Sequence, residues 1–233
     1  MAENSDILQA FPAASEYLTN IYLIQRDYGH VSNVQLAQWM HVSNPAVTQA
    51  INRLKKLELV AQPRYKHILL TEKGRTVAMG VLRRHYLLEH LLVGILKYPW
   101  DKADDEAHVL QNHFSNALTD HLEAYLGHPE TCPHGNPLPG SRREREILAA
   151  PTLISALAGD QFSIVRITEE GEAIPEILPF CELHGIKPLA RFRLAAVGDS
   201  ELSLSSIDFP AEGDFSISRL LARHIGIQRI NVI

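Results

Sequence analysis

Apolar residues recur at helical spacing in the first thirty residues of the chain. Leu18, Ile21 and Ile24 fall on one face of a predicted helix, with Ser15 as its N-cap and its end near Gly29. The pattern is that of an amphipathic helix with one buried face.

Two further helices are predicted, separated by a turn of three residues. Ser32 begins a capping box for a short helix over residues 33–40, and Ser43 is the N-cap of a helix that runs to about residue 57. Pro45 fits the first turn of this helix, where a missing N–H is not needed. A short helix, a tight turn and a second helix with a polar N-terminal end are typical of a helix-turn-helix.

Two short apolar runs come next and predict a β-hairpin. Residues 59–62 and 67–70 are strand-like, and the turn between them carries Arg64 and Lys66. A hairpin with a basic tip is the wing of a winged helix-turn-helix. We therefore interpret residues 1–75 as a DNA-binding domain.

Residues 76–140 are predicted to hold two long amphipathic helices. The first reaches from Thr71 to about Lys97, Pro99 interrupts the chain, and the second spans about residues 102–126. Together these helices have more apolar surface than the small N-terminal module can cover. A subunit interface would bury that surface, and a twofold dimer would match a palindromic operator.

The last third of the chain alternates apolar and polar side chains, as β-strands do. A short helix from Pro175 to His184, ended by Gly185, is expected among the strands. Residues 141–159 are interpreted as a linker to this domain of residues 160–233. The strands are expected at residues 161–167, 190–197, 201–205 and 226–232.

Composition and charge narrow the class of protein. The chain has 233 residues, of which 45% are hydrophobic and 21% charged, which excludes a mainly disordered protein. The net charge of −5 hides a basic segment, because residues 43–75 carry seven Lys and Arg side chains against two Glu. A DNA backbone responds to this local charge. Two cysteines, no secretory signal and no long apolar run favour a cytoplasmic protein.

Histidines gather in the middle of the chain, where seven of the twelve lie between residues 85 and 134. His85 and Glu89 are one helical turn apart, as are Asp104 and His108. Imidazoles and carboxylates on facing helices are the ligands that Fe²⁺, Mn²⁺, Co²⁺ and Zn²⁺ take. The pattern therefore predicts a transition-metal site.

Two other groups are interpreted as structural. His90, His121 and His128 are expected to be surface residues or hydrogen-bonded core residues. Cys132 and His134 could form a zinc or redox site with Cys181 and His184, but no Cys-x-x-Cys pair supports this, so we interpret them as part of a loop between domains.

Several separated segments resemble the diphtheria-toxin-repressor and manganese-transport-regulator family of metal-dependent repressors. They are residues 15–22 (SEYLTNIY), 42–49 (VSNPAVTQ), 70–75 (LTEKGR), 84–89 (RHYLLE) and 132–140 (CPHGNPLPG). The resemblance covers nearly the whole chain. It implies a mainly α fold with a small β part: a winged helix-turn-helix domain, a helical dimerisation domain with two neighbouring metal sites, and a C-terminal SH3-like (FeoA-like) β-barrel.

The resemblance also implies metal ligands. Glu16 stands where the family has Met or Asp, Asp104 replaces a His, and His108 replaces a Cys or Glu. The Glu-His pair of the family is here Gln111-Asn112, and because a neutral amide binds divalent ions weakly, one of the two sites is predicted to be weakened or lost. The predicted metal set is Glu16, His85, Glu89, Asp104, His108 and Gln111, with Glu172 and Glu176 from the barrel; a register shifted by one residue would add His113.

Ten residues are predicted to contact DNA. Those expected to face the major groove are Ser43, Asn44, Pro45, Ala46 and Gln49. Those expected to contact phosphates are Thr48, Arg53, Lys56, Arg64 and Lys66. A metal that joins Glu16 to the histidines of the dimerisation domain would hold the two winged heads of a dimer one helical turn of DNA apart, roughly 34 Å.

The sequence thus predicts a homodimeric transcriptional regulator that binds palindromic operator DNA when Mn²⁺ or Fe²⁺ is bound, with Zn²⁺ and Co²⁺ as alternatives. A repressor of metal-uptake genes is the expected role. One alternative is a regulator of the same fold that has lost or altered its metal dependence. A metallohydrolase using His85, His108 and Glu89 is a second, but no nucleophile motif or phosphate loop supports an enzyme. A barrel that binds proline-rich peptides is a third, and it lacks an aromatic groove.

Overall fold

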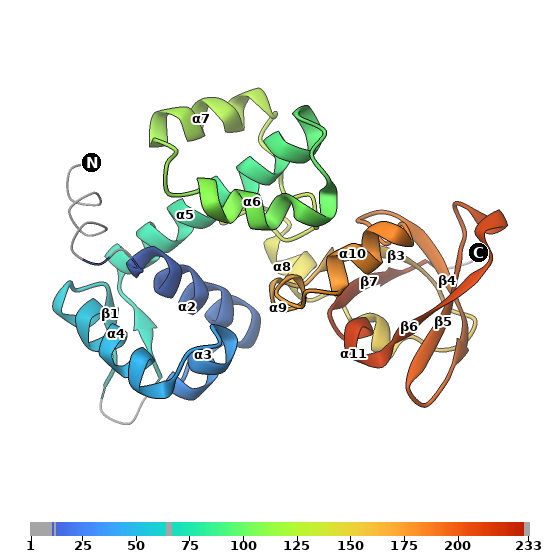
Figure 1. Cartoon of the computed structure of the whole chain (residues 1–233), viewed down its shortest axis with the longest axis horizontal. Coiled ribbons are helices and arrows are strands. Elements are labelled where there is room, and N and C mark those ends of the chain that lie inside the picture. The colour runs from blue at the N-terminus through green and yellow to red at the C-terminus, as the bar shows by residue number, and fades with distance from the viewer. Residues whose placement is uncertain (1–10, 12, 64–66, 231–233) are drawn as a thin grey trace. The chain divides into compact units, whose positions relative to one another are not determined.

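The computed structural model describes residue 11, residues 13–63 and residues 67–230, so the wing-tip residues Arg64 and Lys66 lie outside the described residues. The chain divides into two compact units, Met1–Arg84 and His85–Ile233 (Figure 1). The predicted division into three domains and a linker stays a prediction. Within the described ranges, no helix is both long enough and apolar enough to cross a membrane.

The first unit is a winged helix-turn-helix, as predicted. Its apolar positions Leu18, Ile21, Val47, Ile51 and Leu54 are all fully buried, and each such side chain stabilises the fold by about 1.5–3 kcal/mol. The two strands pair antiparallel, as the wing requires. The elements are α2 (Ala14–Tyr28), α3 (Asn33–Trp39), α4 (Asn44–Lys56), β1 (Val60–Ala61), β2 (Leu69–Leu70) and the start of α5 (Glu72–His90).

Two of the three predicted N-caps are confirmed. Oγ of Ser32 accepts the N–H of Gln35 at 3.1 Å, and Oγ of Ser43 accepts the N–H of Ala46 at 3.3 Å. The prediction for Ser15 is wrong, because α2 begins earlier, at Ala14, and the serine is buried within its first turn.

The second unit opens with the end of α5, which continues into a π-helical turn, η1 (Leu91–Ile95). After η2 (Trp100–Lys102), the predicted single helix over residues 102–126 is two helices, α6 (Ala103–Leu110) and α7 (Asn116–Tyr125). Ser115 explains the break, because its Oγ accepts the N–H of Leu118 at 3.2 Å and so caps a new helix.

A five-stranded antiparallel sheet forms the C-terminal barrel, with the order β6-β5-β4-β3-β7. The four predicted strands are confirmed, whereas β6 was not predicted, since only Ile217 in it is fully buried. Phe162 and Phe192 lie at the centre of the core, and Trp100 from η2 packs into it. The strands are β3 (Gln161–Ile167), β4 (Arg191–Val197), β5 (Glu201–Ser206), β6 (Asp214–Ser218) and β7 (Ile225–Arg229).

Short helices join these strands and the segment before them. Residues 141–159 are packed on the barrel through the buried Leu153 and Ala156, and Thr152 forms a β-bridge with Gly226. The predicted helix from Pro175 to His184 is confirmed as α10. The helices are α8 (Glu144–Leu148), η3 (Leu153–Ser155), α9 (Glu169–Glu172), α10 (Ile177–Leu183), η4 (Pro210–Glu212) and α11 (Arg219–Ala222).

Candidate functional site

The first unit exposes one face of α4 and its N-terminal turn. Val47, Ala50, Ile51 and Leu54 bury the opposite face, so the helix is held by its apolar side and presents its polar side to solvent. Among the predicted DNA contacts, Ala46 is half-buried. The others within the described ranges are exposed: Ser43, Asn44, Pro45, Thr48, Gln49, Arg53 and Lys56.

A chain of hydrogen bonds runs from the wing strand to α4. Nε2 of Gln62, directly after β1, donates to Oδ1 of Asn33 at 2.7 Å, and Nδ2 of Asn33 donates to Oγ1 of Thr48 at 3.3 Å. The hydroxyl of Thr48 in turn donates to the carbonyl of Asn44 at 3.0 Å. Because this hydroxyl hydrogen is directed at the helix itself, the phosphate contact of Thr48 stays a prediction.

The second unit holds two groups of metal-binding side chains that share Glu89. In the first group, Nε2 of His85 donates to Oδ1 of Asp104 at 2.9 Å, and Oε1 of Glu89 lies equally close to the same nitrogen. One N–H can point at only one acceptor. Oε1 of Glu89 therefore forms no hydrogen bond with the described residues.

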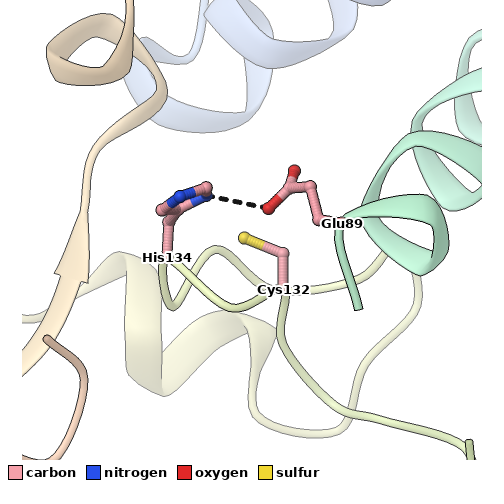
Figure 2. A group of neighbouring side chains, drawn as sticks. All are labelled: Glu89, Cys132 and His134. Atoms are coloured by element: carbon pink, nitrogen blue, oxygen red, sulfur yellow. Dashed lines mark hydrogen bonds and ion pairs between the residues drawn. The ribbon is translucent and has the colours of Figure 1, made fainter. Parts of the chain in front are cut away.

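The second group joins Glu89 to the loop after α7. Figure 2 shows Glu89 on α5 facing Cys132 and His134, which both point from this loop toward the helix. Nδ1 of His134 lies 2.8 Å from Oε2 of Glu89. A sulfur, a nitrogen and a carboxylate oxygen of these three residues lie within 4.8 Å of one another, and all three residues are buried.

Glu172 on α9 brings a further carboxylate to the second group. Its Oε2 lies 3.6 Å from Nδ1 of His134, its side chain is only 3% exposed, and Oε2 has no hydrogen-bond partner among the described residues. Its Oε1 accepts a hydrogen bond from Nδ2 of Asn136, whose Oδ1 accepts one from Arg166 at 3.1 Å. Asn136 and Arg166 therefore hold Glu172 against the loop.

The loop conformation follows from close packing on the end of β3. Gly135 has φ +94°, and a Cβ on it would come within 2.2 Å of the carbonyl oxygen of Val165, so only glycine fits. The N–H of Ile167 donates to the carbonyl of His134 at 2.9 Å. These contacts join the loop to the barrel and place Cys132 and His134 beside Glu172.

The charges of the two groups shift the proton affinities of the histidines and Glu89. Burial by itself lowers the pKa of His85, but the carboxylates of Asp104 and Glu89, each 2.9 Å from Nε2, outweigh burial and hold the pKa well above its ordinary value. Burial also opposes a charge on His134, and the nearby Glu89 carboxylate again raises the pKa overall. The two imidazoles lower the pKa of Glu89 despite its burial.

The pKa values of Glu172 and Cys132 are raised, in contrast to that of Glu89. Burial raises the pKa of Glu172 well above its ordinary value, and the charges of Glu169, Asp104 and Glu89 raise it further. Burial and the same kind of carboxylate neighbours raise the pKa of the Cys132 thiol. The surroundings of the two donor groups thus disfavour additional negative charge and favour positive charge.

These residues fit a divalent transition metal. Buried carboxylate oxygens without hydrogen bonds, on Glu89 and Glu172, are costly unless a cation or proton satisfies them. Cys132 and His134 add the sulfur and nitrogen donors that Fe²⁺, Co²⁺ and Zn²⁺ accept readily. The donor set of the second group is therefore Glu89, Cys132, His134 and Glu172.

The structure brings together only part of the predicted metal set. His85, Glu89 and Asp104 meet, and Glu172 lies beside them. The His108 ring centroid is 6.4 Å from that of His85, and its Nδ1 is hydrogen-bonded to Gln111 at 3.1 Å. Three further candidates have exposed side chains: Glu16 in the first unit, and His113 and Glu176 in the second.

Sequence reasoning missed Cys132 and His134 as candidate ligands, since it interpreted them as loop residues. The only local signal is the spacing of Cys and His two residues apart, which is weak. Their partner Glu89 lies 43 residues before Cys132, so the group exists only in the folded chain. Nε2 of His134 donates to the carbonyl of Trp100 at 3.0 Å, which is the support that metal-binding histidines usually have.

Comparison with known proteins shows two family profiles. One, described as the N-terminal DNA-binding domain of iron-dependent repressors, matches residues 11–68, and the other, their metal-binding and dimerisation domain, matches residues 71–140. The iron-dependent repressor IdeR of Mycobacterium tuberculosis is 34% identical over 153 residues, which are 66% of this chain. The diphtheria toxin repressor of Corynebacterium diphtheriae is 31% identical over 124 residues, or 53% of this chain.

The matched segments span 64% of IdeR and 55% of the diphtheria toxin repressor, which is less than two thirds of either relative. Solved structures match over more of the chain. A manganese-dependent transcriptional repressor in complex with manganese is 30% identical, with a TM-score of 0.77 over 93% of this chain and 100% of that one. ScaR with bound Zn²⁺ is 25% identical, with a TM-score of 0.72 over 93% of this chain and 99% of that one.

Proposed function

The chain belongs to the iron-dependent repressor family, and from this premise we propose that it is a dimeric transcriptional repressor whose affinity for operator DNA is set by a bound transition metal. The observation that carries the proposal is the shared carboxylate of Glu89. Its two oxygens face two groups of donors, one with His85 and Asp104 and one with Cys132 and His134. Such a buried set has no use in a protein that only binds DNA.

In this proposal the second group holds a metal ion through Glu89, Cys132, His134 and Glu172, and His85 and Asp104 offer a neighbouring site on the other side of Glu89. The bound ion supplies positive charge that neutralises the buried carboxylates. His134 can bind through Nδ1 because its Nε2–H is held by the carbonyl of Trp100. Glu172 belongs to the barrel, so metal binding would also stabilise the packing of the barrel on the loop.

We propose Mn²⁺ or Fe²⁺ as the ion, with Zn²⁺ and Co²⁺ as alternatives. IdeR and the diphtheria toxin repressor support iron by their names, and the manganese-dependent repressor supports manganese. The thiol of Cys132 favours the softer ions over Mn²⁺. Glu16, His108 and Gln111 remain proposed ligands of a further site, and the barrel contribution of Glu176 remains a proposal of the same kind.

The DNA face of the proposed repressor is the exposed side of α4 together with the wing. Gln49 and the residues at the N-terminal turn of α4 would read bases in the major groove, while Arg53, Lys56, Arg64 and Lys66 would contact phosphates.

A homodimer is proposed because large apolar side chains of the helical part are exposed, including Val109 (64%) and Tyr125 (70%). Palindromic operators of metal-uptake genes, in the cytoplasm, are the proposed targets.

Thermodynamic linkage requires that the metal bind more tightly to the DNA-competent state, and that DNA tighten the metal by the same factor. The test is fluorescence anisotropy with the protein's own upstream DNA, measured with chelator and with each of the four metals. We expect operator affinity to rise at least tenfold with the physiological metal, and to stay at the chelated value in Glu89→Gln. Equal affinity with metal and with chelator would instead support the metal-independent regulator of the same fold.

A further inference from the structure

A pocket of about 380 Å³ lies beside the metal-binding groups, between the start of α6 and the segment that joins α9 to α10. Its wall carries four carboxylates, from Asp101, Asp104, Asp105 and Glu172, and one ammonium group, from Lys102. Leu178 and Pro179 of α10, with residues 173–175 before it, form the rest of the wall. The pocket is therefore strongly acidic on one side.

Two of these carboxylates belong to the pocket and to the buried donor groups at the same time. Asp104 is hydrogen-bonded to His85, and its side chain is 29% exposed, whereas the side chains of His85, Glu89 and His134 are at most 8% exposed. Glu172, on the inner wall, has the buried Oε2 that no described group satisfies. A second pocket of about 310 Å³, beside α8, shares no residue with the donor groups.

We propose that the acidic pocket is the vestibule through which a hydrated divalent cation reaches the buried donors. Asp101 and Asp105 attract the ion, and Asp104 and Glu172 replace its first water ligands as it moves inward. Metal–ligand bonds replace metal–water bonds, and the protons that the donor side chains lose pass to solvent. This inference rests on the proposed metal dependence, and it assigns to Asp101 and Asp105 a role in the rate of loading rather than in holding the bound ion.

The charge of the vestibule explains why such a role falls on these residues. Clefts lined by one sign of charge raise the association rate of an oppositely charged ligand, and this effect is reduced by salt. Asp101 and Asp105 are not among the groups whose donor atoms meet within 4.8 Å. Neutralising either one should therefore slow the arrival of the ion more than its release.

The first test is stopped-flow loading of the metal-free protein with Co²⁺, whose absorption changes when a thiolate binds it. For Asp101→Asn and Asp105→Asn we expect the association rate constant to fall about threefold or more at low salt, and its salt dependence to flatten. The release rate constant should change by less than about twofold. Asp199→Asn, an exposed carboxylate in the β4–β5 turn that does not line the pocket, is the matched control and should load at the parent rate.

The second test obstructs the pocket without changing its charge. Ala173 is exposed, lines the pocket and is the C-cap of α9, while Ala149 is an equally exposed C-cap, of α8, outside the pocket. Ala173→Phe should slow Co²⁺ loading and release by the same factor and leave Kd unchanged, which is the signature of an obstructed path. Ala149→Phe should change neither rate.

The outcomes separate the two proposals. If the parent protein bound no Co²⁺ with thiolate absorption, the proposed metal site would be wrong. If the parent bound Co²⁺ but both aspartate variants loaded at the parent rate, the vestibule would be overturned and the metal site would stand. Loading and release of Co²⁺ by Ala173→Phe at the parent rates would also overturn the vestibule.

Discussion

His134 donates its Nε2–H to the carbonyl oxygen of Trp100 and presents Nδ1 to Glu89, 2.8 Å away. Because a carbonyl can only accept, this bond determines which nitrogen carries the hydrogen and leaves Nδ1 as the nitrogen that meets the carboxylate. At this separation a proton lies between Nδ1 and Oε2, and a metal ion bound by both atoms would replace it. Trp100, whose ring packs into the barrel core, thereby orients a ligand of the proposed metal site.

The first prediction concerns the ligands themselves. At a metal concentration one hundredfold above Kd, the parent should gain about 2.7 kcal/mol of unfolding free energy. Cys132→Ser and His134→Ala should each lose most of this gain in thermal or urea unfolding. Cys181→Ser is the control, because Cys181 is equally buried in the barrel core but lies away from the donor groups, so its metal-dependent gain should match that of the parent. Gains equal to the parent value in both ligand variants would contradict the site.

The second prediction concerns protons. The raised pKa values of His85, His134 and Glu172 mean that the metal-free protein keeps protons on this cluster to a higher pH than free side chains would. A metal must displace them, so its affinity should rise as the pH rises and fall as the pH falls toward 5. Calorimetry in two buffers of different ionisation enthalpy should show more than one proton released per ion. Buffer-independent heats would show that the ion binds elsewhere.

The third prediction concerns the loop that carries the ligands. Gly135→Ala combines a positive φ with a Cβ 2.2 Å from the carbonyl oxygen of Val165, so we expect a loss of about 3 kcal/mol in unfolding free energy and weakened metal binding. Gly140→Ala is the matched control. It also has a positive φ, of +81°, but has open space around the added Cβ, so backbone strain of about 1–2 kcal/mol is the whole expected cost. Similar losses in the two variants would show that the close packing of Gly135 contributes nothing.

The fourth prediction concerns DNA. Gln49→Ala should change the preference among operator bases, because Gln49 is exposed on the face of α4 that is proposed to enter the major groove. Lys56→Ala should weaken binding to all sequences and reduce the slope of log K against log salt by about one unit. Competition binding on a set of single-base operator variants distinguishes the two effects. Parent-like binding by both variants would exclude α4 as the recognition helix.

The fifth prediction concerns the amide pair where the family has a Glu-His pair. Gln111 is buried and hydrogen-bonded to His108, so an acidic side chain there would face an imidazole. Gln111→Glu with Asn112→His should add one metal equivalent per chain, counted by elemental analysis after dialysis. An unchanged metal count in the double variant would show that the predicted register of this site is wrong.

The sequence by itself determined the winged module, because residues close together in the chain specify each of its helices. The caps at Ser32 and Ser43 and the apolar faces of α3 and α4 each depend on residues within one or two helical turns. Four of the five strands of the barrel, all but β6, follow from alternation in the same way. The error at Ser15 is equally local, because α2 begins one residue before it, at Ala14, without a side-chain cap.

Tertiary structure alone decided the second group of donors. Glu89 lies on α5, Cys132 and His134 on a loop, and Glu172 on α9 after β3, so no periodicity along the chain relates them. The packing of Trp100 in the barrel core and the contact of Gly135 with Val165 bring the loop to the barrel. The same packing encloses carboxylates from segments far apart in sequence, and the cost of burying them is the reason that we propose a cation site there.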